Sequence, residues 1–277
     1  MFRAWIAASL VVVVPLALTA CRSVRPRPDS TSAKPARVAP VSPQALARIW
    51  DAEHVSPPLP PLLEHDEVER RLQAVSQADP SRFIFERVGA SIEGRSINLI
   101  TTGTGSFRVL LWSQMHGDEA TATAALFDVF DYFQRHRDDP VVQRILSSLT
   151  LYVVPMLNPD GAERFQRRNA QGIDINRDAL VLQTPEGQLL KSLRDRFNPR
   201  VGFNLHNQGW NTSLGDPPKP ASISLLSVAY DKPRSESAGR KLTKKVRRSA
   251  RAPWFRRARS CPPAGWSWAC PPSRSGR

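Results

Sequence analysis

The stretch from Arg108 to Phe130, RVLLWSQMHGDEATATAALFDVF, joins a continuous apolar run to an amphipathic one. Its first part, Arg108–Gln114, is typical of a strand that is buried on both faces. Apolar side chains then recur at helical spacing, which predicts a helix over Ala120–Arg135. The polar tetrapeptide His116–Glu119 lies between the two, directly after the strand.

The same alternation continues on both sides of this stretch. Further strands are predicted at Phe83–Val88, Ile97–Thr101, Leu149–Val154 and Val201–Leu205, and Ile223–Ala229 is a candidate for one more. A helix that ends near Phe197 opens at Thr184, a capping residue followed by proline. The pattern predicts an α/β protein with a mostly parallel sheet, in which ligands bind beyond the carboxyl ends of the strands.

The polar residues at these strand ends suit a metal ion. His116 and Glu119 are three apart, and an opening helical turn would point both side chains to one side. His206 follows the strand Val201–Leu205 directly and offers a third ligand. A single histidine at a strand end is more often structural, but the three together favour catalytic Zn²⁺, which takes three protein ligands and a water molecule.

Four motifs give the chain a resemblance to the zinc metallocarboxypeptidase family, the carboxypeptidase A/B-like group. They are HGDE at His116–Glu119, NPDG at Asn158–Gly161, RRNAQGIDINRD at Arg167–Asp178, and LHNQ around His206. The resemblance covers about Val88 to Ala229. It implies an α/β/α sandwich around a mixed sheet, one Zn²⁺ per chain held by His116, Glu119 and His206, and removal of C-terminal residues from peptides or proteins.

The resemblance also implies roles for three polar residues. Asn176 and Arg177 stand where the family binds the terminal carboxylate of its substrate, and a planar guanidinium suits that group. Arg167 stands at the position of the arginine that stabilises the oxyanion, with Arg168 as the neighbouring candidate. The competing interpretation of Arg177 is a surface ion pair with Asp174 or Asp178. Asn158–Gly161 is expected to form a structural turn.

The C-terminal part departs from the family pattern. The family needs a glutamate as general base after the second histidine, yet only Asp216, Asp231 and Glu236 follow His206, and Tyr230 does not match the family's mobile-loop tyrosine. From Arg247 onward the chain has no acidic residue and no periodicity. A frameshift that replaced the last strands accounts for this composition, and a natural basic tail is the alternative. We therefore expect a truncated domain over residues 61–231, a disordered tail over 232–277 and an impaired enzyme.

The positive charge of the chain belongs to this tail. Of the 39 Lys and Arg residues, 14 lie between Lys232 and Arg277 together with one of the 25 acidic residues. The remaining 231 residues, with 25 basic and 24 acidic side chains, are nearly neutral. Nucleic acid is therefore not expected as a partner, although Trp254, Phe255 and the surrounding arginines could attract anionic lipid.

The N-terminal residues are typical of a targeting signal. Residues 1–20 resemble a lipoprotein signal peptide, with an apolar run too short to span a bilayer, and Cys21 is the expected lipidation site. Residues 21–60 form a Pro-rich tether with a short helix considered at Pro43–Glu53. The protein is thus expected outside the cytoplasm, anchored to a bacterial membrane through lipid, in the outer membrane or periplasm of a Gram-negative cell. With Cys261 and Cys270 in the tail, no disulfide framework is expected.

Two other functions compete with the peptidase. One is a zinc amidohydrolase of the succinylglutamate desuccinylase or aspartoacylase type, which shares the His, Glu and later His. The other is a catalytically dead zinc-binding lipoprotein, which the missing glutamate favours. The NPDG and DINRD stretches favour the peptidase.

The frameshift hypothesis can be checked in the gene. Translating the DNA downstream of Lys245 in the other two frames is expected to give a strand-like stretch that contains a glutamate. Its absence from both frames would leave the natural basic tail as the explanation.

Overall fold

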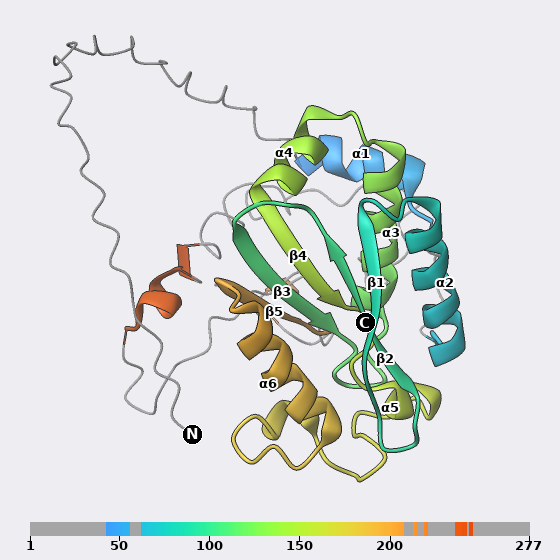
Figure 1. Ribbon diagram of the computed structural model, residues 1–277, viewed down its shortest axis with the longest axis vertical. Helices are drawn as coiled ribbons and strands as arrows, with labels where there is room; N and C mark the ends of the chain where they lie inside the picture. Colours follow the sequence, from blue (N-terminus) through green and yellow to red (C-terminus); the bar gives the residue numbers. More distant parts are fainter. Residues whose placement is uncertain are drawn as a thin grey trace, which may run out of the picture. The chain divides into compact units, whose positions relative to one another are not determined.

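The computed structural model of the protein describes residues 43–55, 62–207, 213–214, 219–220, 236–242 and 244–245. Within these residues, one sheet has the strand order β1-β2-β4-β3-β5 (Figure 1). Its strands are β1 (Phe83–Ala90), β2 (Ser96–Thr102), β3 (Phe107–Ser113), β4 (Leu149–Val154) and β5 (Val201–Leu205). The pairs β1/β2 and β2/β4 are antiparallel, whereas β3 runs parallel to both β4 and β5. The sheet is therefore mixed, as the family resemblance implied, with two parallel and two antiparallel strand pairs rather than mostly parallel ones.

Helices cover both faces of this sheet (Figure 1). The helical elements are α1 (Pro43–Glu53), α2 (His65–Ala78), α3 (Thr121–Arg135), α4 (Pro140–Ser148), α5 (Pro159–Glu163), a 3₁₀ turn (Ile175–Arg177) and α6 (Pro185–Phe197). A small ribbon pairs β6 (Ser213–Leu214) with β7 (Lys219–Pro220). None of the helices in the described ranges is long and apolar enough to cross a membrane.

Two apolar cores separate the layers. One holds side chains of α2, α3 and α4 against the sheet, including Leu72, Phe130 and Ile100. The other packs α6 against the opposite face through Leu193 and Leu99. Leu99 and Ile100 are neighbours on β2 and enter different cores, which is the period-two alternation of a strand. The arrangement is the α/β/α sandwich expected from the sequence.

Short capping motifs set where the helices begin. Thr184 caps α6 by accepting a hydrogen bond from the Gly187 N–H (2.9 Å), and Pro185 follows as the first helical residue. Asn158 does the same for α5, because its Oδ1 accepts from the Gly161 N–H (2.9 Å). The expectation of a turn at Asn158–Gly161 is therefore wrong, since the Asn-Pro pair that suits a turn also starts a helix.

The short helix considered at Pro43–Glu53 is confirmed as α1. Its C-terminal end lies against α3, where Glu53 contacts Arg135 and His136. The Val55 N–H donates to Asp128 (2.8 Å). These contacts fasten a piece of the expected tether to the sandwich.

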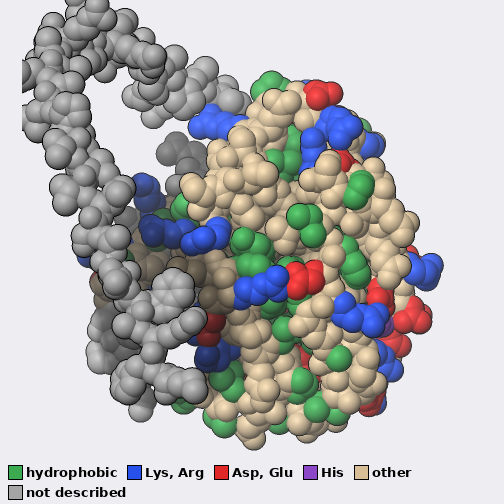
Figure 2. Space-filling model, viewed as in Figure 1, with side chains coloured by type: hydrophobic (Ala, Val, Ile, Leu, Met, Phe, Trp, Pro, Cys, Tyr) green, Lys and Arg blue, Asp and Glu red, His purple; other side chains and the backbone are tan. Residues whose placement is uncertain are grey.

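Several sequence expectations fall outside the described residues. These are the signal peptide, the lipidation site Cys21, the candidate strand Ile223–Ala229 and most of the tail over 232–277. Residues 238–242 and 244–245 of that tail are described, and they are helical rather than disordered. On the face shown in Figure 2, basic and acidic side chains are interspersed. This distribution agrees with the nearly neutral composition of the sandwich region.

Glu186 is a buried acid in the first turn of α6. Its side chain is fully buried; Oε2 accepts a hydrogen bond from Asn169 (3.1 Å), and Oε1 has no partner among the described residues. Burial raises the pKa of the Glu186 carboxyl above its usual value of 4.5, and the charges of Asp160 and Asp178 add to this rise. The folded protein therefore keeps a proton that the unfolded chain loses above about pH 4.5.

Because the folded state retains this proton and the unfolded chain loses it, the free energy of unfolding falls as the pH rises. The wild-type free energy of unfolding is expected to decrease above pH 4.5, whereas Glu186→Gln, which has no such proton to lose, should show less of this decrease. Denaturant unfolding over a range from roughly pH 4 to pH 8 measures it. Glu64→Gln, at an exposed glutamate that makes no capping bond, is the matched control and should follow the wild type. Parallel curves for wild type and Glu186→Gln would contradict the prediction.

Candidate metal centre and active site

The sheet topology brings the three predicted metal ligands together. In the parallel pair β3/β5, Ser113 lies opposite Leu205, so both strands end at the same edge of the sheet. His206 follows Leu205 directly, and His116 lies three residues beyond Ser113. The two imidazole rings are consequently neighbours, with centroids 4.7 Å apart.

Glu119 lies between the two histidines. Its Oε1 is 2.8 Å from His116 Nδ1, and its Oε2 is 2.6 Å from His206 Nδ1. One ligand atom from each of the three residues lies within 4.8 Å of the other two. His116 is buried and the other two side chains are partly buried. Two imidazole nitrogens and a carboxylate oxygen are a donor set that zinc accepts, so these residues fit a zinc ion.

The segment that carries His116 and Glu119 is a turn rather than the opening of a helix. The Glu119 N–H donates to the His116 carbonyl (3.1 Å), and α3 begins only at Thr121. The turn lies so close to α5 that a Cβ at Gly117 would collide with the Gly161 backbone. Glycine at position 117 therefore lets the ligand-bearing turn pack against α5.

Asp174 orients His116 from the other side of the ring. Its Oδ1 lies 3.1 Å from His116 Nε2, so a proton on Nε2 leaves Nδ1 free to bind a metal. The other carboxylate oxygen accepts hydrogen bonds from Arg167 Nε (3.1 Å) and Nη2 (3.0 Å). Sequence reasoning weighed Asp174 only as an ion-pair partner of Arg177. Its place two residues before Asn176 in the DINR motif was the available signal.

The two acids of this cluster are held in their charged form. Burial raises the pKa of Glu119, but hydrogen bonds from His116 and His206 outweigh it and bring the pKa to about 2. Burial likewise raises the pKa of Asp174, and bonds from Arg167 and His116 more than offset that, so the net shift is downward. A carboxylate that is ionised at neutral pH is the form that binds a cation.

Two residues with predicted roles in the reaction, Arg167 and Asn176, contact the cluster. Arg167 reaches it directly, with Nη1 at 3.1 Å from His116 Nδ1 and 3.8 Å from Glu119 Oε1. Arg168, the neighbouring candidate, turns away and donates to the Gly172 carbonyl (2.8 Å). Asn176 Nδ2 lies 3.4 Å from His206 Nε2. The geometry therefore favours Arg167 over Arg168 as the arginine next to the metal ligands.

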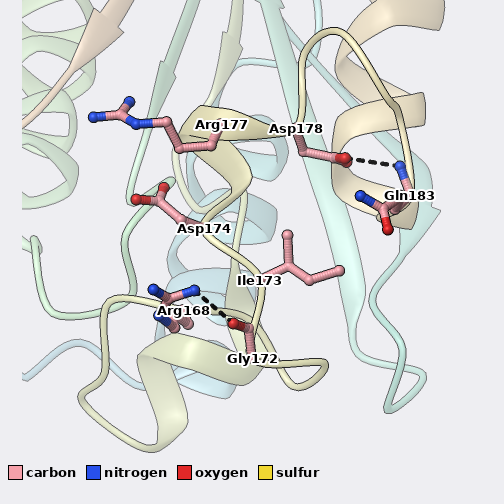
Figure 3. A pocket seen from close by; sticks show the side chains of 7 residues that line it. All are labelled: Arg168, Gly172, Ile173, Asp174, Arg177, Asp178 and Gln183. Atoms are coloured by element: carbon pink, nitrogen blue, oxygen red, sulfur yellow. Dashed lines mark hydrogen bonds between the residues drawn. The ribbon is translucent and has the colours of Figure 1, made fainter.

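Arg177 lies at a cavity beside the cluster. The cavity has a volume of about 390 Å³ and is also lined by Arg168, Asp174 and Gln183 (Figure 3). In Figure 3 the Arg177 guanidinium extends to the side where the Asp174 carboxylate lies and away from Asp178. Its hydrogen bond goes to the Asn176 carbonyl (3.1 Å), and it forms no ion pair with either acid within the described ranges. The surface ion pair is thus not formed.

A general base is not identified by these contacts. Asp216, Asp231 and Tyr230 lie outside the described residues. Glu236 is described, and its carboxylate contacts Lys244. That contact gives Glu236 a local partner in its own segment.

Comparisons with known proteins point to one family. Residues 68–247 match the family model described as zinc carboxypeptidase. Carboxypeptidase M of Mus musculus is 28% identical over 128 residues, which is 40% of this chain and 29% of that protein. Carboxypeptidase A2 of Rattus norvegicus is 24% identical over 177 residues, covering 62% of this chain and 37% of that protein. The chain thus aligns with well under half the length of these two relatives.

Solved structures with a partial likeness include bacterial proteins. A metallo-carboxypeptidase from Burkholderia cenocepacia has a TM-score of 0.49 and 23% identity, covering 53% of this chain and 42% of that chain. A metallo-carboxypeptidase from Pseudomonas aeruginosa has a TM-score of 0.46 and 25% identity, covering 53% and 40%. The latter was solved in complex with (2-guanidinoethylmercapto)succinic acid.

The ligand set can be tested by zinc affinity. Asp174→Asn is expected to weaken zinc binding by about 10–100-fold, because a neutral amide oxygen accepts the Nε2 proton of His116 more weakly than the carboxylate does. His206→Ala, which removes a ligand outright, should weaken it further. Competition with a chromophoric chelator measures both. His54→Ala, at a histidine directly after α1 whose ring bonds to the Trp50 carbonyl, should retain wild-type affinity. Equal affinity in all four proteins would rule out this cluster as the zinc site.

Proposed function

Because the chain belongs to the zinc carboxypeptidase family, we propose that it removes C-terminal residues from peptides or proteins in a zinc-dependent reaction. The observation that carries the proposal is the convergence of His116, Glu119 and His206 at the carboxyl edge of the sheet. A metal site of this composition stands beside two arginines that can bind an anionic substrate.

Arg177, Asn176 and Arg167 have separate roles in the proposed reaction. Arg177 would bind the substrate's terminal carboxylate with its planar guanidinium, and Asn176 would add a neutral donor. Arg167, already next to the metal ligands, would donate to the carbonyl oxygen as negative charge develops there. The chemistry that zinc supplies when bound is polarisation of the scissile carbonyl and activation of a water molecule.

The rate of this chain is expected to be low. The family resemblance calls for a glutamate as general base, and Glu236 is the only glutamate after His206. General acid–base catalysis contributes typically about 10²–10⁴-fold to a rate. We therefore propose that the protein binds zinc and hydrolyses peptides at a reduced rate. The extreme of this reduction is a protein that binds zinc and has no activity.

The cellular setting belongs to the same proposal. Lipidation at Cys21 would anchor the protein to a bacterial membrane, with the enzyme domain outside the cytoplasm. Substrates would then be extracytoplasmic peptide or protein C-termini, and no nucleic-acid partner is proposed. The observations in support are the sequence of residues 1–21 and the near neutrality of the sandwich region.

Peptide hydrolysis tests the proposed reaction. The zinc-loaded full chain should release the last residue of peptides with a free C-terminus, and a chelator should abolish the release. C-terminally amidated peptides are the matched control and should resist. Cleavage of N-acylated amino acids in place of peptides would instead support the amidohydrolase. Zinc binding without any turnover would support the zinc-binding protein that lacks activity.

Arg167 gives a sharper prediction within the same assay. Arg167→Gln should lower kcat by about 10²–10³-fold, because it removes a donor to the developing oxyanion. The KM should change much less, since Arg177 still binds the terminal carboxylate. Arg144→Gln, at an exposed arginine on α4, is the control. A raised KM with unchanged kcat would show that Arg167 acts in ground-state binding instead.

A further inference from the structure

We infer that Arg168 is a specificity-determining residue that selects peptides whose C-terminal residue has an acidic side chain. This inference rests on the proposed function, because it assumes that Arg177 binds the terminal carboxylate. Arg168 and Arg177 line one cavity of about 390 Å³ (Figure 3). This volume lies within the range of about 300–1,000 Å³ that small-molecule sites occupy.

Within the described residues, neither acid that lines the cavity forms an ion pair with Arg168 or Arg177. Both oxygens of Asp174 are engaged, one by His116 and the Asn176 N–H, the other by Arg167. Both oxygens of Asp178 are engaged as well: Oδ1 accepts from the Gln183 N–H (2.8 Å), and Oδ2 from the N–H (2.8 Å) and hydroxyl (2.7 Å) of Thr184. Both oxygens of each carboxylate therefore already accept hydrogen bonds from other groups of the protein.

The two guanidinium groups keep most of their hydrogen-bonding capacity. Among the described residues, Arg168 bonds to the Gly172 carbonyl and Arg177 to the Asn176 carbonyl, both neutral acceptors. Each guanidinium has five N–H donors and a permanent charge. The cavity thus offers two guanidinium groups that form no ion pair with an acidic side chain of the described residues.

Two guanidinium groups in one cavity, each without an ion-pair partner among the described residues, suit a ligand with two anionic groups. A peptide that ends in glutamate or aspartate has them, the main-chain carboxylate and the side-chain carboxylate of the same residue. With Arg177 on the first, Arg168 is the group available for the second. Arg167 cannot take this role, because it is bonded to Asp174 beside the metal ligands. The two consecutive arginines, Arg167 and Arg168, would therefore contact different groups of the substrate: the scissile carbonyl oxygen and the side-chain carboxylate of the last residue.

An isosteric pair of peptides tests the inference. The full chain is assayed with peptides that end in Glu or in Gln, which differ in charge and little in shape. Hydrolysis by the zinc-loaded protein gives the ratio of the two kcat/KM values. Calorimetric binding of the same peptides to the zinc-free protein gives the ratio of the two Kd values without any turnover. The variants are Arg168→Gln, Arg168→Lys and, as a matched control, Arg144→Gln.

The wild type should favour the Glu peptide by about tenfold in both ratios, as expected for one charge-assisted contact. Arg168→Gln should reduce the preference to near unity, Arg168→Lys should restore part of it, and Arg144→Gln should retain it. A binding preference without hydrolysis would support the inference while overturning the proposed activity. Equal affinity of the wild type for both peptides, or a preference that survives Arg168→Gln, would overturn the inference even if both peptides are hydrolysed.

Discussion

The parallel pairing of β3 with β5 is the interaction on which the rest of the site depends. It sets Ser113 opposite Leu205 and so brings His116 and His206 to one edge of the sheet from positions 90 residues apart in the chain. Glu119 can lie between the two rings only because both strands end there. A shift of the register by one residue would turn every side chain of β5 to the opposite face and separate the histidines.

Much of this arrangement could be predicted from the sequence, because the signals are local. The apolar runs of β3 and β4 are continuous, and polar residues of the kinds that bind metal follow β3 and β5 directly. Strand ends in a parallel sheet share an edge, so the ligands could be placed together before any coordinates were known. The start of α6 could be predicted equally well, since Thr184 is a capping residue and Pro185 is a first-turn proline.

Other features depend on contacts that a linear pattern does not encode. The helix α2 carries Val68, Leu72 and Val75 at helical spacing, yet its mean character is so polar that no helix was predicted there. The sequence of Asn158–Gly161 suits a turn and a helix start equally. In the structure this segment starts α5, and α5 packs against the turn at Gly117. The role of Asp174 emerges only when His116, 58 residues away, comes within hydrogen-bond distance.

Asp174 joins two parts of the site through a single carboxylate. One oxygen fixes the imidazole of a metal ligand, and the other holds the guanidinium that faces the reacting carbonyl in the proposed mechanism. The orientation of the ring and the position of the guanidinium are thus energetically coupled, so a double-mutant cycle between His116 and Arg167 would be non-additive. A substitution that displaces either group therefore also displaces the other, and the segment from Arg167 to Asp174 acts as one structural unit.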